Sequence, residues 1–287
     1  MTRRTLARTV AAAAAALITT SCSTAVGASG EQQPAPEAPG RLTRTLPDDP
    51  VRMALPATGA ETRWTQGLNV FGQQVARAAA AECARESGFG LTEEIPLAFI
   101  PFGDLPDLDF LGRHGFGHSA EVPAGTAEPA PARSGGTAEI RRCRTAGATA
   151  AEQVTKVYQP LQMAWFGALA SAAKRDSAAA RVLRDVPGCL SEQGYAVADQ
   201  KAFFALADRR LMNAPAADLD RVNSELGHAY ATCMRPVEAV REPARRHLRK
   251  RFLADHAEEV RDLRAALVPA LHRAGKRYGV PLAFPAP

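Results

Sequence analysis

The sequence predicts an all-α fold held together by disulfide bonds. Alanine, leucine and arginine favour helices and are abundant, whereas aromatic residues make up only 6% of the chain. Apolar residues recur at three- and four-residue steps along several long stretches, as they do in amphipathic helices. Four cysteines lie on or at the end of these stretches. We therefore expect a bundle of about five or six helices with one long irregular loop, preceded by a disordered tether.

The charge of the chain does not indicate a nucleic-acid partner. The formal net charge is +5, but Arg3, Arg4 and Arg8 contribute three of these charges near the N-terminus. The rest of the chain is close to neutral, unlike a domain that binds a phosphate backbone. One basic stretch remains, from Arg241 to Arg251. We interpret it as a solvated helix face, with contact to phosphate or lipid headgroups as the alternative.

Residues 1–21 have the three-part layout of a secretory signal peptide. Arginines open the segment, and an uncharged, alanine-rich run follows from Val10 to Ile18. That run is too short to stay in a bilayer as a spanning helix. Small residues then precede Cys22.

The sequence that ends at Cys22 resembles the processing site of bacterial lipoproteins. The resemblance implies that Cys22 is lipidated and becomes the first residue of the mature protein. We then expect the protein on the outer face of the cytoplasmic membrane, held by an N-terminal lipid anchor. If Cys22 is not lipidated, and the site is an ordinary signal-peptidase site, the protein is secreted.

Residues 22–62 are predicted to form a disordered tether. They are rich in proline, glycine, alanine, serine and threonine and show no apolar period, so they bury too little surface to offset the entropy of ordering. A helical domain is expected at residues 63–280, followed by a tail at 281–287.

The helical domain is predicted to open with a helix from about Leu68 to Cys83, closed at Gly88. An irregular loop at residues 90–136 follows, because repeated prolines forbid a long helix there. We expect the part from Ala120 to Gly136 to be disordered.

Helical periodicity resumes near Ala138 and continues almost to the end of the chain. Pro160 is expected to kink or restart the first of these helices, and Asp199 to cap a later one. Pro236 and Pro243 are expected to interrupt the next helix. Gly279 is expected to cap the last.

One motif occurs twice in the chain. Cys83 is followed by Gly88 and an aromatic residue, and Cys189 is followed by Gly194 and another aromatic residue. A glycine just past a helix can adopt the left-handed conformation, and the next hydrophobic residue then packs back on the last turn. The motif therefore predicts a helix C-terminus that carries a thiol.

The four cysteines after Cys22 are predicted to form two disulfides. An even number of cysteines in an exported chain favours disulfides, and their wide spacing lacks the close pairs of zinc sites. An up-and-down order of helices predicts the pairs Cys83–Cys143 and Cys189–Cys233. The rival arrangement joins Cys83 to Cys189 and leaves Cys143 for Cys233.

Residues 90–120 hold the other candidates for chemistry. Gly117 to Glu121 is one residue away from a Gly-x-Ser-x-Gly nucleophile motif, but it lacks the flanking strand and helix. His114 and His118 are four residues apart and could share a zinc ion on a helix, although the glycines between them favour a loop with incidental histidines. Three nearby acids could act in acid–base catalysis or bind calcium, or simply be solvated: Asp104, Asp107 and Asp109. We therefore predict no cofactor, no metal site and no catalytic residue.

These motifs together resemble a broad set of actinobacterial secreted or lipid-anchored proteins of unknown function. The resemblance extends from about Trp64 to Leu271. It rests on the two cysteine–glycine–aromatic motifs, Phe102-Gly103, Arg113 to Gly117, Arg142-Cys143-Arg144 and Cys233. It implies an architecture and a location outside the cytoplasm, but no chemistry.

The sequence therefore favours a non-enzymatic envelope protein with a binding or structural role. The expected partners are the membrane, through the lipid anchor, and an envelope protein or cell-wall component that the sequence does not identify. The alternative is a cell-envelope hydrolase whose site is built on the 90–120 loop.

Overall fold

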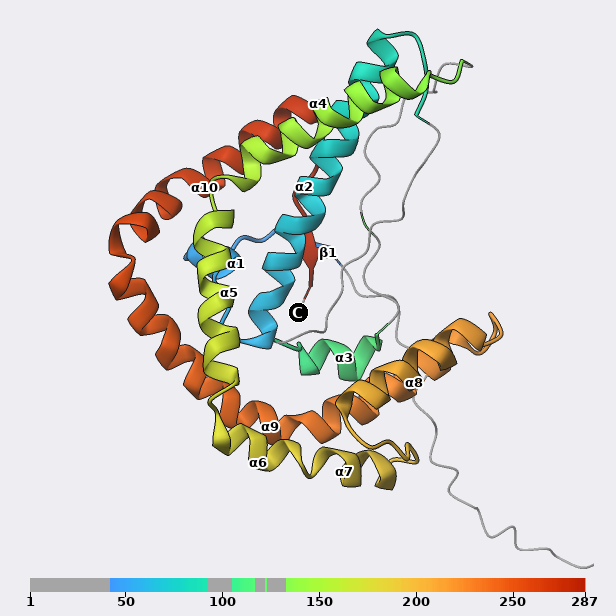
Figure 1. The fold of residues 1–287 in the computed structure, drawn as a ribbon, viewed down its shortest axis with the longest axis vertical. Helices are drawn as coiled ribbons and strands as arrows, with labels where there is room; N and C mark the ends of the chain where they lie inside the picture. The colour runs from blue at the N-terminus through green and yellow to red at the C-terminus, as the bar shows by residue number, and fades with distance from the viewer. Residues whose placement is uncertain (1–41, 92–104, 117–121, 123–132, 287) are drawn as a thin grey trace, which may run out of the picture. The chain divides into compact units, whose positions relative to one another are not determined.

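The computed structural model describes residues 42–91, 105–116, 122 and 133–286. This part of the chain is almost entirely helical, which confirms the predicted fold class (Figure 1). The helices are α1 (Val51–Ala54), α2 (Gly59–Glu86), α3 (Leu108–His114), α4 (Thr137–Thr155), α5 (Gln159–Ala173), α6 (Ser177–Leu183), α7 (Val186–Glu192), α8 (Gln200–Asn213), α9 (Leu219–Asp255) and α10 (Ala257–Tyr278). Two short strands, β1 (Leu42–Thr43) and β2 (Phe284–Pro285), pair antiparallel.

Several helix boundaries follow the expected local chemistry. Pro160 occupies the first turn of α5 and so restarts the helix after α4, as predicted. The carboxylate of Asp199 accepts a hydrogen bond from the backbone N–H of Ala202 at 2.7 Å and caps α8. Gly279 adopts the left-handed conformation at the end of α10. In each case the residue satisfies or removes a backbone group that a helix end leaves unpaired.

The folded domain begins earlier than we predicted, because the tether does not reach residue 62. Within residues 42–62, the residues Val51, Met53, Ala54, Leu55 and Ala57 are all buried, and α2 already starts at Gly59. This segment is too short and too irregular to show a helical period, so composition alone made it resemble a linker.

The predicted tail at 281–287 is also part of the fold. Phe284 is fully buried, and a Cβ atom at Gly67 would lie 2.1 Å from its ring. The ring therefore packs directly on the backbone of α2. The strand pairing of Leu42 with Pro285 ties the beginning of the described chain to its end.

The prolines of α9 do not interrupt it, in contrast to the prediction. α9 runs for 37 residues with Pro236 and Pro243 inside, and Figure 1 shows it as a continuous, curved helix. Proline removes a backbone hydrogen bond and usually bends a helix. Here Met234 and Val237 are completely buried on either side of Pro236, so packing holds the helix together where the backbone bond is lost.

Two hydrophobic cores share α9. One core gathers side chains from α1, α2, α4, α5, α9 and α10, including Met53, Leu68, Phe71, Trp165, Phe252 and Leu267. The other gathers side chains from α3, α7, α8 and the first half of α9, including Leu111, Leu190, Phe203, Leu226, Tyr230 and Met234. α9 is therefore the element that connects the two.

Candidate functional site

Both copies of the cysteine–glycine–aromatic motif form the predicted helix ends. Gly88 and Gly194 have φ angles of 74° and 86°. After α2, the N–H of Phe89 donates to the carbonyl of Ala84 at 3.0 Å; after α7, the N–H of Tyr195 donates to Leu190 at 2.8 Å. These six-residue hydrogen bonds define a Schellman motif, and in both copies the aromatic ring is buried over the last turn.

The disulfides confirm the predicted pairing. Cys83 at the end of α2 is bonded to Cys143 of α4, with a Cα–Cα distance of 5.4 Å. Cys189 of α7 is bonded to Cys233 of α9, with a Cα–Cα distance of 5.7 Å. Each copy of the motif is thus joined to the helix that packs beside it. Disulfides persist in oxidising compartments, so both bonds are compatible with export.

The 90–120 loop is partly helical, and its described acids have structural roles. Asp107 caps α3, where its carboxylate accepts from the N–H of Phe110 at 3.0 Å. Burial raises the pKa of Asp107, and the nearby Asp109 adds to the rise. Asp109 forms an exposed ion pair of 3.0 Å with Arg235 of α9.

His114 also contributes to packing. Its ring lies against Phe110, one turn earlier, with centroids 4.6 Å apart, and its carbonyl accepts a hydrogen bond of 2.7 Å from Asn223. Gly115 follows with φ 72°, and a Cβ atom there would lie 2.4 Å from Asn223. Glycine is required at this position because α3 approaches α9 so closely.

The remaining candidates, Cys22, Asp104, His118 and the segment Gly117 to Glu121, lie outside the described residues, so the predictions about them stay predictions. Within the described ranges, no group of three or more histidine, cysteine or acidic side chains is placed to hold a metal ion. No described helix is long and apolar enough to cross a membrane.

A buried ionic network, which the sequence did not reveal, joins α1, α2 and α9. The carboxylate of Glu61 is 2% exposed and accepts from Arg52 at 2.8 Å, from Arg249 at 2.5 Å and from the N–H of Ala57 at 2.8 Å. Burial alone would raise the pKa of Glu61, but these donors together hold the pKa below its usual value.

The network corrects our interpretation of the basic stretch from Arg241 to Arg251. Arg245 is 9% exposed, pairs with Glu238 on the preceding turns, and donates to the carbonyl of Ala57 at 3.0 Å. Arg249 reaches Glu61, as described above. Two of these cations therefore face inward, and the stretch is only in part a solvated face. An acid and a base seven residues apart beside buried apolar positions, here Glu238 and Arg245, form the sequence pattern that could have indicated this buried ion pair.

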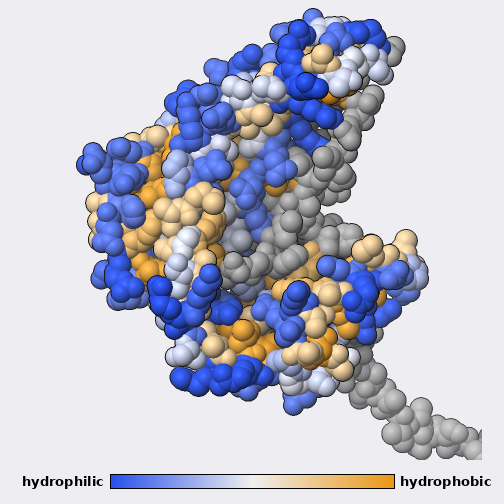
Figure 2. All heavy atoms as spheres, in the orientation of Figure 1, coloured by the Kyte–Doolittle hydropathy of each residue, from blue (hydrophilic) through white to orange (hydrophobic). Residues whose placement is uncertain are grey.

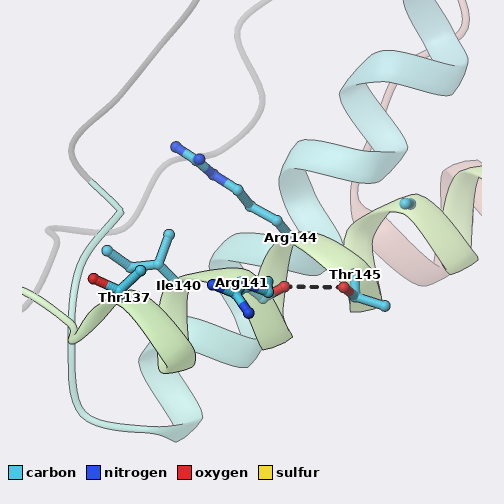
Figure 3. A pocket seen from close by; sticks show the side chains of 6 residues that line it. Thr137, Ile140, Arg141, Arg144 and Thr145 are labelled. Atoms are coloured by element: carbon cyan, nitrogen blue, oxygen red, sulfur yellow. Dashed lines mark hydrogen bonds between the residues drawn. The ribbon is translucent and has the colours of Figure 1, made fainter.

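A groove lies along one face of α4. Its volume is about 520 Å³, within the usual range for small-molecule sites. The described lining residues form one stripe along the helix: Thr137, Ile140, Arg141, Arg144, Thr145 and Ala148. Figure 3 shows Arg144 extending away from the helix, while the hydroxyl of Thr145 donates to the carbonyl of Arg141 at 3.0 Å. The groove offers guanidinium and hydroxyl groups, which suit an anionic ligand.

The opposite face of α4 explains why this stripe is left outside. Cys143 is fully buried in its disulfide to α2, and Gly147 lies so close to α2 that a Cβ atom would be 2.3 Å from the carbonyl of Ala76. The two helices are therefore pressed together along the buried face. The polar stripe lies on another face of α4.

The chain matches no protein-family model, no curated protein and no solved structure.

Proposed function

We propose that the protein is an exported, lipid-anchored envelope protein whose helical domain has a binding role and not a catalytic one. The observation that carries the proposal is the pair of disulfides, each closing a helix end onto its neighbour. Such bonds would not persist in a reducing cytoplasm. The N-terminal sequence, with its apolar run and Cys22, supplies the corresponding route and anchor.

The contacts of the described loop residues support a binding role over the hydrolase alternative. Asp107 caps a helix, Asp109 pairs with Arg235, and His114 packs against Phe110. A general acid or base must instead reach the group from which it takes a proton or to which it gives one. The α4 groove presents cations and hydroxyls, which bind anions without chemical change.

Detergent partition tests the anchor. Produced in a bacterial host with its own signal sequence, the wild-type chain should enter the detergent phase, and its N-terminal peptide should carry acyl mass on Cys22. Cys22→Ser should leave the protein unprocessed or in the aqueous phase, whereas the control Ser23→Ala should behave as wild type. A soluble wild-type protein that begins after Cys22 would contradict the proposal. Stable attachment needs more than one acyl chain, as a single chain binds only marginally.

A further inference from the structure

Helix α5 has an exposed face that carries no charge. The sequence is uncharged from Val157 to Ala173, which includes the whole of α5. Leu161, Trp165 and Leu169 are buried in the core that α5 shares with α1, α2 and α10. The opposite side of the helix, here called the α5 face, is exposed and consists of Pro160, Met163, Ala164, Gly167, Ala170 and Ser171. A helix with apolar residues all round is normally buried on every side, so this exposure is unusual.

The α5 face is continuous along the helix. Its residues recur at three- and four-residue steps and therefore lie in one row. Met163 is 61% exposed in the first half of the row, and a Cβ atom at Gly167, in the middle, would meet no described atom within 4 Å. Figure 2 shows hydrophobic side chains gathered where Figure 1 draws α5. A contiguous apolar surface of this kind, unlike a single exposed methionine, indicates a contact site.

Cations lie at both ends of the α5 face. Lys156 precedes the helix, and Lys174 and Arg175 follow it; all three are exposed. Lys174 and Arg175 have no ion-pair partner among the described residues. Of the carboxylates close in sequence, Asp176 caps α6 and Glu152 lies on α4, one turn before Lys156. An apolar helix face bordered by cations is typical of a helix that lies in the surface of a bilayer, where long basic side chains reach the headgroups.

The size of the α5 face argues against a second copy of the chain as its partner. The helix has 15 residues, so it is about 22 Å long and about 10 Å wide. This area of about 220 Å² is far below the roughly 800 Å² that each partner of a stable protein complex buries. A second copy would also bring further lysine and arginine side chains to the ends of the helix. A bilayer needs no matching surface, and its phosphates complement the cations.

We propose that the α5 face rests on an anionic phospholipid leaflet. Met163 and the alanines of the face would then lie against the acyl boundary, while Lys156, Lys174 and Arg175 contact headgroup phosphates. The contact is too small to hold the domain at a membrane alone, since an interfacial helix binds in proportion to the apolar area that it buries. Its effect is to orient a domain that is already held there.

The proposal rests on the proposed function, because the lipid anchor at Cys22 brings the domain to the membrane. The 20 residues from Cys22 to residue 41 span at most about 70 Å when fully extended. This length leaves the domain free to turn, so the anchor alone fixes no orientation. The α5 face would supply the orientation.

Methionine oxidation on tethered protein tests the orientation. The probe is the chain from Cys22 onward with both disulfides formed, so that Cys22 is the one free thiol among its five cysteines. Cys22 is coupled to a maleimide lipid in phosphatidylcholine vesicles with or without phosphatidylglycerol. Hydrogen peroxide then converts exposed methionines to the sulfoxide, and peptide mass spectrometry gives the rate at each site. Met212 on α8, which is 85% exposed, is the internal control.

Tethering to the anionic vesicles should slow the oxidation of Met163 by at least about fivefold, which corresponds to a face that is covered about four-fifths of the time. The rate at Met212 should stay the same. Because chemical coupling replaces acylation, the result does not depend on whether the cell acylates Cys22. Conversely, an acylated protein whose Met163 oxidises at the same rate with and without the vesicle keeps the anchor and loses this proposal.

Charges placed on the α5 face should abolish the protection. Ala164→Glu with Ala170→Glu should return Met163 to its rate in the untethered protein, because carboxylates are repelled from an anionic leaflet and are costly to bury. The matched control is Ala205→Glu with Ala216→Glu, two exposed alanines on α8 and after it, and should leave Met163 protected. Circular dichroism should show unchanged helicity in both variants, since all four positions are exposed.

Neutral substitutions test the cations. Lys174→Gln with Arg175→Gln should lower the protection of Met163 on anionic vesicles by at least about twofold, because each basic residue near the surface adds to the attraction. Lys201→Gln with Arg209→Gln, which removes two exposed cations of α8, should lower it less. Equal protection on neutral and anionic vesicles would contradict the role of the cations.

Three outcomes would overturn the proposal as a whole. The first is an unchanged rate at Met163 on tethering. The second is equal protection of Met163 and Met212, which would indicate general shielding by the vesicle and no orientation. The third is protection of Met163 in untethered protein that rises with protein concentration, together with a doubled mass in sedimentation equilibrium, which would assign the face to a second copy.

Discussion

At the scale of single residues, the buried carboxylate of Glu61 connects parts of the chain that are far apart in sequence. It accepts from Arg52, from the backbone of Ala57 and from Arg249, which lies 188 residues away. Removing one member of a buried ion pair is costly because the remaining charge keeps its desolvation penalty without its partner. Replacing Glu61 would therefore leave the guanidinium groups of Arg52 and Arg249 partly desolvated and without their counter-charge.

We expect Glu61→Gln to lower the free energy of unfolding by about 3 kcal/mol at neutral pH, measured by urea titration with circular dichroism. Glu258→Gln, which removes an exposed pair with Arg261, should have almost no effect. The folded pKa of Glu61 lies below the usual value of 4.5, so its stabilisation is present above that pH and is lost as the pH falls through the folded pKa. The variant should therefore lose less stability than the wild type on acidification. If the free energy of unfolding falls equally with pH in the wild type and in Glu61→Gln, this expectation is wrong.

The two capping glycines allow a test of backbone conformation alone. Gly88 and Gly194 have positive φ, and a Cβ atom at either would meet nothing within 4 Å. Alanine at either site should therefore cost about 1 kcal/mol through the left-handed conformation and not through a clash. Gly167 in α5 is equally open but has a helical conformation, so Gly167→Ala should raise stability by about 0.5–1 kcal/mol. The capping role is supported if urea titrations show a lower free energy of unfolding for alanine at Gly88 or Gly194 and a higher one for Gly167→Ala. An equal change at all three sites would contradict it.

At the scale of elements, each disulfide joins two helices that also pack together. The bonds close loops with sequence separations of 60 and 44 residues. In the chain-entropy model, either loop restricts the unfolded chain enough to contribute about 4 kcal/mol, before any strain is subtracted.

We expect Cys189→Ala with Cys233→Ala to lower the free energy of unfolding by up to about 4 kcal/mol, and the Cys83 and Cys143 pair to behave similarly. Reduction of the wild type should lower its melting temperature further than either double variant, because it removes both bonds. Non-reducing peptide mapping supplies the control. A peptide that joins Cys83 to Cys189 or to Cys233 would show that the helix order is wrong.

The elements that could be predicted from the sequence are those whose signals are local. The Schellman motifs need only a glycine and an aromatic residue in the right places, and the start of α5 needs only Pro160. The segment around Val51 and the strand at Phe284 could not be predicted, because each is ordered by distant parts of the chain and has no period of its own. The continuity of α9 through its prolines is likewise a tertiary effect.

The candidate site also combines features that could be predicted from the sequence with features that could not. The cysteine pairing followed from the order of the helices, since the turn that ends one helix fixes which end of the next lies beside it. The α4 groove could not be predicted from the sequence, although Arg142-Cys143-Arg144 is a recognisable motif there. Only the burial of Cys143 against α2 determines that the stripe with Arg141 and Arg144 faces outward.

At the scale of the whole molecule, the two largest hydrophobic cores of the described chain have one helix in common. Leu190 and Phe203 belong to the core around α7 and α8, whereas Leu267 and Trp165 belong to the core around α5 and α10. α9 contributes Tyr230 to the former and Phe252 to the latter. Regions that share few contacts can open separately, as cooperative units of different stability.

We therefore expect the core around α7 and α8 to open without the rest of the molecule. Leu190→Ala should cost about 2–5 kcal/mol, because it leaves a cavity at a fully buried position. Hydrogen exchange followed by mass spectrometry should show faster exchange in α7, α8 and the first half of α9, while α2 and α10 stay protected. Leu267→Ala, equally buried in the other core, should show the reverse pattern. If both variants accelerate exchange in every helix alike, α9 couples the two cores into one cooperative unit.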